Sequence, residues 1–237
     1  QTEQMRAIQF RLGWHQVAPL QTAQLLIRPE RVLKGKLPAP AALAAGFALR
    51  AGTALRDALK SKATGEVREL KSFDESHDRL WEACSRELHC AVRRDASYLN
   101  WKYVDQPGQD FLRLEVRSAS GARGIVVLMF RDPDSAYRYR RGFIVDLVAP
   151  LSDDELMADL LMTAARAAAE RGADALVCLH INGRLGNCLQ RAGFRMRQPT
   201  RYLLVRPETV DDRLRRQLLD PDGWFVTHGD SDIDRPW

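Results

Sequence analysis

The 237-residue sequence lacks the cysteine and histidine spacings that hold zinc. Its five histidines form no HxxxH or HExxH motif and its four cysteines form no CxxC pair, so we expect no metal site. Scattered thiols in a chain of this size are typical of a reducing compartment, and we expect a cytoplasmic location. The cysteines are Cys84, Cys90, Cys178 and Cys188.

A long hydrophobic run is also missing. The longest apolar stretch, 37–49, is interrupted by Pro38, Pro40 and Gly46, and it is too short for a membrane-spanning helix. The chain begins at Gln1 with no basic and then apolar leader, so no signal peptide is expected. Because Gln1 takes the place of an initiating methionine, we expect an N-terminal portion to precede it.

The net charge of +5 is modest and is not concentrated. The densest basic group, Arg138, Arg140 and Arg141, is interleaved with Tyr137 and Tyr139. A basic balance suits nucleic acid, a nucleotide cofactor or an anionic surface, but spread-out charge is more simply a solvated surface. No nucleic-acid partner is therefore expected.

The sequence does contain one motif that occurs twice. Each copy has a helix end stopped by glycine and an aromatic residue, and then an apolar strand closed by Arg-Pro-Glu. The first copy covers 10–14 and 25–30, and the second covers 190–194 and 203–208. We expect residues 1–30 to be the C-terminal remnant of a preceding unit, with two strands joined by a turn near Pro19.

The rest of the chain predicts a linker and then one complete unit. Lys34-Gly35-Lys36 and nearby prolines indicate a linker over 31–65, with a connecting helix over about 40–62. From residue 66 onward, strands and helices alternate up to 208, and 209–237 reads as a helix and a tail. The expected strands are 67–73, 111–117, 125–130, 143–148, 175–179, 194–197 and 202–206, and the expected helices begin at the capping residues Asp74, Asp95, Ser152 and Asn182.

This order of elements resembles the GNAT N-acetyltransferase superfamily over about 66–208. The run from Asn182 to Gly193-Phe194 is similar to the family's segment after its fifth strand. Residues 145–150, followed by a long helix, resemble its fourth strand and cofactor-binding helix, and 98–103 resembles a segment of a bacterial subgroup. The resemblance implies an α/β (α+β) fold with a mixed central sheet flanked by helices.

The resemblance also implies a chemistry. Family members take an acetyl group from acetyl-CoA, the expected co-substrate, and transfer it to an amine of a small molecule, sugar or peptide. The cofactor lies where the fourth and fifth strands splay apart, with its diphosphate on the N-terminus of the following helix. By position, the implied cofactor contacts are Leu147, Val148, Ser152 and Asn182, and the implied catalytic residues are Asp146 and His180.

Three of these residues have a simpler structural interpretation. In that interpretation Asp146 acts as a cap or pairs with a neighbouring arginine, His180 is a satisfied histidine at the rim of the sheet, and Asn182 is the N-cap of the last helix. The sequence alone leaves both interpretations open.

The sequence departs from the family's pattern at two places. The turn that usually carries glycines reads Ser152-Asp153-Asp154-Glu155, and each acidic side chain close to a diphosphate costs about 1 kcal/mol in water. Leu189 stands where many members have a tyrosine that protonates the leaving thiolate. Two alternatives follow: a catalytically degenerate binding or dimerisation unit paired with an N-terminal GNAT-like unit, or an aminoacyl-tRNA-dependent transferase of the same fold.

Overall fold

The computed structural model describes residues 3–34, 65–108, 110–119 and 121–231, with positions 38, 40, 41 and 43–45 between the first two ranges. The connecting helix expected over 40–62 lies largely outside the described residues, as does the tail beyond 231. No helix in the described ranges is long and apolar enough to cross a bilayer.

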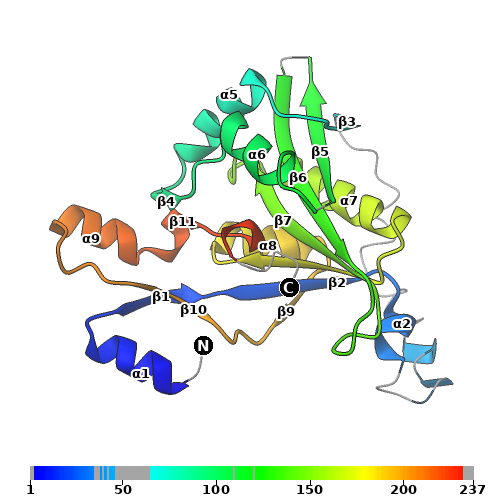
Figure 1. Cartoon of the computed structure of the whole chain (residues 1–237), viewed down its shortest axis with the longest axis horizontal. Coiled ribbons are helices and arrows are strands. Elements are labelled where there is room, and N and C mark those ends of the chain that lie inside the picture. Colours follow the sequence, from blue (N-terminus) through cyan, green and yellow to red (C-terminus); the bar gives the residue numbers. More distant parts are fainter. Residues whose placement is uncertain are drawn as a thin grey trace.

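A seven-stranded mixed sheet with strand order β3-β5-β6-β7-β8-β2-β9 forms the centre of the molecule (Figure 1). β7 and β8 are parallel, and the other neighbouring pairs of this sheet are antiparallel. The strands are β2 (Gln21–Leu26), β3 (Glu66–Glu69), β5 (Phe111–Ser118), β6 (Gly121–Arg131), β7 (Arg141–Val148), β8 (Ala175–His180) and β9 (Arg195–Arg197).

Helices cover both faces of this sheet. α5 (Glu75–Ser85) and α6 (Ala96–Tyr103) lie on one face, and α7 (Asp154–Glu170) and α8 (Gly183–Arg191) lie on the other. Strand β6 shows the cause, because its side chains alternate between faces. Val126 and Leu128 join the core beneath α7, whereas Val127 and Met129 join the core beneath α5. The predicted α/β (α+β) fold with a mixed sheet between helices is confirmed.

Local capping sets the helix starts. Asp74 accepts the N–H of Ser76, and His77 Nδ1 reaches back to the Asp74 N–H at 2.9 Å, which completes the capping box of α5. For α7, Ser152 was expected to be the N-cap, but that prediction is wrong. Asp153 caps the helix by accepting the Leu156 N–H at 2.9 Å, because it stands one position closer to the first turn.

The N-terminal strands are shared between two sheets. β1 (His15–Pro19) pairs antiparallel with β10 (Tyr202–Val205) in a separate two-stranded ribbon, whereas β2 lies inside the main sheet between β8 and β9. Leu20 alone separates β1 from β2, and its N–H donates to the Arg201 carbonyl at 2.9 Å. The turn predicted near Pro19 is therefore wrong, since the chain runs on from the ribbon into the sheet.

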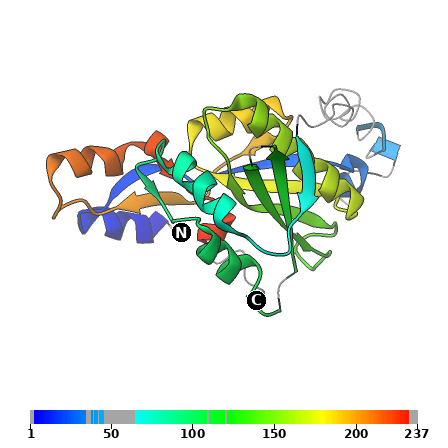
Figure 2. The same cartoon turned by 90° about the horizontal axis from the view of Figure 1, so that it is seen from above.

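The ribbon extends away from the main sheet, with α1 (Glu3–Arg11) and α9 (Asp212–Leu219) on opposite sides of it (Figure 2). α9 corresponds to the helix predicted over 209–219. The short helix α2 (Pro29–Leu33) follows β2 at the far end of the molecule.

After α9 the chain returns to the main body. It passes through the 3-10 turn η1 (Pro221–Gly223), the strand β11 (Trp224–Phe225) and the 3-10 turn η2 (His228–Asp230). β11 pairs in parallel with the two-residue strand β4 (Cys90–Ala91). This pairing carries the tail across to the region between β7 and β8.

Candidate functional site

Strands β7 and β8 stop pairing halfway along β7. They pair in parallel from Arg141 opposite Ala175 to Ile144 opposite Cys178, and the last four residues of β7 have no partner on β8. A bulge in the β6–β7 register lies at Val145, between Ile144 and Asp146. Because a bulge bends and twists its strand, it turns the end of β7 away from β8 and opens a wedge.

The chain's own C-terminal segment fills this wedge. His228 Nδ1 lies 3.3 Å from the backbone nitrogen of Leu179 on β8 and 3.2 Å from the carbonyl oxygen of Ile144 on β7. Its ring stands edge-on to Phe143, with 5.5 Å between centroids. The imidazole therefore bridges the two strand edges at the point where their pairing ends.

Burial keeps this imidazole neutral. Desolvation lowers the pKa of His228 to about 4, although the Ile144 carbonyl acts in the opposite direction. Both contacts are made by Nδ1, and in a neutral ring this nitrogen either accepts the Leu179 N–H or donates to the Ile144 carbonyl, depending on the tautomer.

The next residue, Gly229, fits only because it has no side chain. A Cβ at this position would lie 2.3 Å from Tyr103 Oη and 3.0 Å from the Val145 carbonyl oxygen. The backbone of η2 thus lies against the unpaired end of β7, which is where the resemblance places the pantetheine arm of the cofactor.

A buried ionic network holds the segment in place. Arg94 is completely buried; its Nε donates to Asp146 Oδ1 at 2.8 Å and its Nη2 donates to Asp230 Oδ2 at 2.6 Å. Tyr103 Oη donates to Asp146 Oδ2 at 2.8 Å, and Thr227 Oγ1 lies 3.3 Å from Asp146 Oδ1. One guanidinium therefore joins a carboxylate of β7 to a carboxylate of the tail.

The pKa values of this network follow from burial and its charges. Burial alone would lower the pKa of Arg94, but the attraction of Asp146 and Asp230 outweighs it and the pKa is raised. Burial also raises the pKa of Asp230 against the pull of Arg94, and it raises that of Tyr103, with Asp146 adding to the shift. Arg94 is accordingly held as a permanent buried cation.

The N-terminus of α7 is likewise already occupied by carboxylates. Glu87 Oε2 accepts the backbone N–H of Ser152 at 3.0 Å, and Asp153 accepts that of Leu156. Asp154 forms an ion pair with Arg191 at 2.9 Å. Backbone N–H groups at a helix start are the usual ligands of a phosphate, and here negatively charged side chains take them.

Each predicted catalytic residue has its own structural partners. Asp146 is 1% exposed and lies in the ionic network described above. His180 is 4% exposed at the end of β8, where its Nδ1 lies 3.2 Å from the Asn182 carbonyl oxygen and a Cβ on Gly186 would touch its ring. Burial lowers the pKa of His180.

The four predicted cofactor contacts are also engaged. Leu147 and Val148 are buried in the cores on opposite faces of the sheet. Ser152 is held by Glu87, whose Oε1 accepts the hydroxyl at 2.5 Å. Asn182 caps α8 by accepting the N–H groups of Arg184 and Leu185, and its Nδ2 donates to the Asp222 carbonyl of the tail at 2.7 Å. These four residues do not line one common surface.

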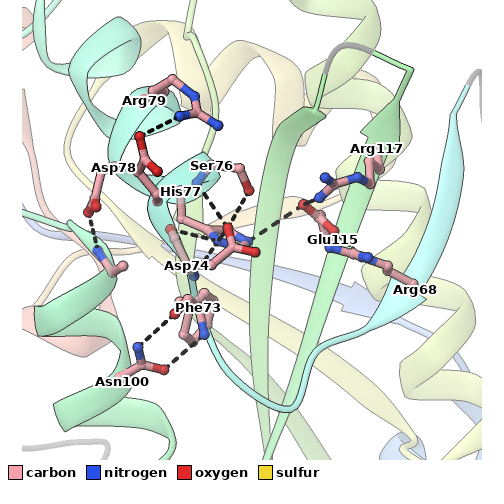
Figure 3. Close-up of polar contacts among 12 residues, drawn as sticks. Arg68, Phe73, Asp74, Ser76, His77, Asp78, Arg79, Asn100, Glu115 and Arg117 are labelled. Atoms are coloured by element: carbon pink, nitrogen blue, oxygen red, sulfur yellow. Dashed lines mark hydrogen bonds and ion pairs between the residues drawn. The ribbon is translucent and has the colours of Figure 1, made fainter.

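A second buried polar cluster lies on β5 and α5 (Figure 3). Glu115 is fully buried; it contacts Arg68 on β3 and Arg117 on its own strand, and its Oε1 lies 3.5 Å from His77 Nε2. These partners neutralise the carboxylate inside the sheet. The cluster therefore stabilises the packing of α5 against β5.

Neighbouring contacts tie α6 to α5. The Asn100 side chain exchanges two hydrogen bonds of 2.8 Å with the backbone of Phe73, and Asp78 Oδ1 accepts the Ala96 N–H at 2.8 Å. We assign this region a structural role.

Sequence reasoning missed the residues that fill the wedge. Nothing local marks Arg94 or Glu87 as different from the many charged residues around them. The run Trp224-Phe225-Val226-Thr227-His228 carried the available signal, since it is the one apolar stretch after the charged helix α9. Apolar residues near a chain end indicate a segment that packs against the body of the protein.

Acyl-CoA does not fit this arrangement of residues. The wedge that would admit its pantetheine arm contains Thr227 to Asp230, and the helix start that would bind its diphosphate is occupied by carboxylates. Both parts of the expected cofactor site are thus filled by groups of the chain itself.

No protein-family model matches the sequence, and no curated protein shows significant sequence similarity to it. A GCN5-related N-acetyltransferase from Anabaena variabilis is similar in structure, with 9% identity, a TM-score of 0.53, and a match over 84% of this chain and 43% of the other.

Two further solved structures are also similar. A probable N-acyltransferase from Enterococcus faecalis, of unknown function, has 10% identity and a TM-score of 0.47 over 84% of this chain and 42% of its own. A functionally unknown conserved protein from Staphylococcus epidermidis has 11% identity and a TM-score of 0.47 over 83% and 64%. The chain spans less than two thirds of the length of each of the three structures. The likeness to the Anabaena variabilis protein shows the fold alone: this chain has the fold of the GCN5-related N-acetyltransferases.

Proposed function

We propose that this chain is a GNAT-fold binding unit that does not bind acyl-CoA itself and that supports acetyl transfer to an amine by a second GNAT-like unit. The observation that carries the proposal is the position of His228 between Leu179 and Ile144, inside the wedge between β7 and β8.

Energetics favours this interpretation over an empty site awaiting its cofactor. Entry of a pantetheine arm would remove η2 from the wedge and separate Arg94 from Asp230. Loss of one partner from a buried ion pair costs about 3–5 kcal/mol, and Asp146, which stays beside Arg94, keeps the cost at the lower end of that range. Since about 1.4 kcal/mol is a factor of ten, a cost of about 3 kcal/mol weakens acyl-CoA binding by roughly two decades.

The start of α7 adds a second obstacle that is independent of the tail. A diphosphate there would compete with Glu87 for the Ser152 N–H and would lie beside Asp153 and Asp154. At close range each such repulsion costs about 1 kcal/mol in water and more when desolvated. Removal of the tail alone is therefore not expected to restore cofactor binding.

The test is a titration of acetyl-CoA into the 237-residue chain by calorimetry, with thermal unfolding in parallel. A ligand at 100 times its Kd adds about 2.7 kcal/mol to the free energy of unfolding. We expect no heat of binding and no change in Tm at millimolar acetyl-CoA. Saturable binding by the wild-type chain at micromolar concentrations would overturn the proposal.

A second candidate is an acetyltransferase whose tail acts as a gate. The observation that favours it is the short β-pairing that leads into η2, because β11 and β4 pair over only two residues each. Gly229→Ala separates the two candidates, since its Cβ cannot fit beside Tyr103 and loosens η2 in the wedge. Acetyl-CoA binding gained by Gly229→Ala would support a gate, and continued absence of binding supports the non-catalytic unit.

A further inference from the structure

The two ends of the described chain are copies of one structural motif. Each of the nine residues of α1 has its counterpart 180 positions further on in α8, from Glu3 and Gly183 to Arg11 and Arg191. A short strand follows each helix, β1 after α1 and β9 after α8. A second strand then follows, β2 after β1 and β10 after β9.

Both helices end in the same way. Gly13 and Gly193 have φ values of +81° and +87°, a conformation that favours glycine. The Trp14 N–H donates to the Gln9 carbonyl at 3.1 Å, and the Phe194 N–H donates to the Leu189 carbonyl at 2.9 Å. These are the six-to-one hydrogen bonds of a Schellman helix end, so the repeat is structural as well as sequential.

The second strand of each copy pairs with the first strand of the other copy. β2 lies against β9, and β10 lies against β1. The two exchanged strands differ in how many neighbouring strands they have. β2 has β8 along its second edge, whereas β10 has β1 as its one neighbouring strand among the described residues.

The helix beside the ribbon, α1, also has apolar side chains exposed to solvent. On α8, Leu185 and Cys188 are 1% and 6% exposed because they face the core beneath α7. Their counterparts on α1, Met5 and Ile8, are both 51% exposed. The same helix face that is core in one copy is thus surface in the other.

The arginine that closes each copy shows the same difference. Arg28, after β2, donates to the Gly172 carbonyl at 2.9 Å and lies 3.6 Å from Asp174, both in the turn before β8. Arg206, after β10, forms an ion pair with Glu208, two residues further along the chain, and its side chain is 53% exposed.

We propose that the ribbon of β1 and β10, with α1, is the closing part of a second GNAT-like sheet in the same polypeptide, and that a strand equivalent to β8 pairs with the open edge of β10. In this arrangement a helix equivalent to α7 covers Ile8, and the turn before the added strand receives Arg206. This second sheet would be the partner of the binding unit, and only its role as that partner rests on the proposed function.

The order of the elements indicates where the partner lies. In the complete copy α7 and β8 come immediately before α8, so their equivalents come immediately before α1. The β8 of a second copy of this chain cannot be this strand, because β2 pairs with it along its whole length and β7 pairs with it from Ala175 to Cys178. An unpaired strand edge is a natural site for strand addition.

The first test is hydrogen–deuterium exchange on two proteins, the 237-residue chain and the polypeptide produced from the natural start of its gene. We expect the amides of Tyr202–Val205 and of α1 to exchange at least tenfold more slowly in the gene-length protein. Equal exchange in both, a gene that encodes no GNAT-like unit before Gln1, or a stable dimer of the 237-residue chain with protected β10 would each overturn the proposal.

A matched pair of variants tests the covered face of α1. Ile8→Lys is expected to leave the Tm of the 237-residue chain unchanged and to lower that of the gene-length protein by several degrees. Ala7→Lys is the control, because Ala7 and its counterpart Asn187 are both exposed, and it should be neutral in both proteins. Identical effects of Ile8→Lys and Ala7→Lys in the gene-length protein would contradict the inference. Acetyl-CoA binding is measured separately, so either proposal can fail without the other.

Discussion

His228 Nδ1 lies 3.3 Å from the backbone nitrogen of Leu179, in the wedge that opens where β7 and β8 stop pairing. The two residues are far apart in the sequence, and their contact brings the C-terminal segment into the centre of the fold. It places a neutral, buried imidazole where the fold family places the arm of its cofactor. The predictions below test what this contact contributes.

The stability of the chain should depend on pH through His228. Its pKa is lowered to about 4 in the folded state, against about 6.5 when unfolded, so the unfolded state binds the proton first. Stability is therefore full above pH 6.5 and falls toward pH 4, by about 2 kcal/mol at pH 5. Urea denaturation at pH 7 and pH 5 measures this loss.

His228→Gln is the control for this pH dependence. Burial also lowers the pKa of His180, which acts in the same direction, so the wild-type chain alone cannot assign the effect. The variant should be less stable at pH 7 and should lose about 2 kcal/mol less than wild type between pH 7 and pH 5. Equal losses in the two proteins would exclude His228 as the origin.

Arg94→Met should destabilise the fold strongly. Arg94 is fully buried between Asp146 and Asp230, and its removal leaves two buried carboxylates without a cation. We expect a loss of about 3–5 kcal/mol in the free energy of unfolding, measured from the urea midpoint. The neighbouring Arg93→Met is the control: that side chain is 77% exposed, and its change should stay within about 0.5 kcal/mol.

Gly229→Ala should loosen the tail through a clash with Tyr103. The new Cβ lies too close to Tyr103 Oη and to the Val145 carbonyl oxygen, and overpacking of this kind costs about 1–3 kcal/mol. Limited proteolysis should cut the chain after Phe225 more readily than in wild type.

A double-mutant cycle tests this origin. Tyr103→Phe removes the nearest clashing atom, so the Gly229→Ala and Tyr103→Phe pair should cost less than the sum of the single changes. Additive effects would show that the clash is not with the tyrosine hydroxyl.

Glu115→Gln should weaken the packing of α5 on β5. The carboxylate is fully buried and serves Arg68, Arg117 and His77, so loss of its charge leaves those partners under-compensated. Arg68 and Arg117 are partly exposed and recover some solvation, and we expect a loss of about 1–3 kcal/mol. Glu69→Gln is the comparison on the adjacent strand, where the side chain is 56% exposed and the change should be near zero.

Several features of this protein follow from the sequence by itself because they depend on neighbours along the chain. The glycine stops at Gly13 and Gly193, the cap at Asp74 and the acidic start of α7 were all readable from a few adjacent residues. The alternation of strands and helices was sufficient to predict the order of the elements, and the resemblance of that order to the GNAT family implied the mixed sheet. These signals are local, since hydrogen bonds within one or two turns produce them.

Tertiary structure alone decided which strand pairs with which and what fills the wedge. β2 and β10 have the same apolar pattern and the same Arg-Pro-Glu ending, so the pattern does not state which of them enters the main sheet. Arg94 and His228 are ordinary residues until β7 bends away from β8 and brings Asp146 and Leu179 to them. Pairing between distant segments depends on the shape and charge of surfaces that exist only after folding. The sequence therefore predicted the strands, but not that β2 pairs with β9 and β10 with β1.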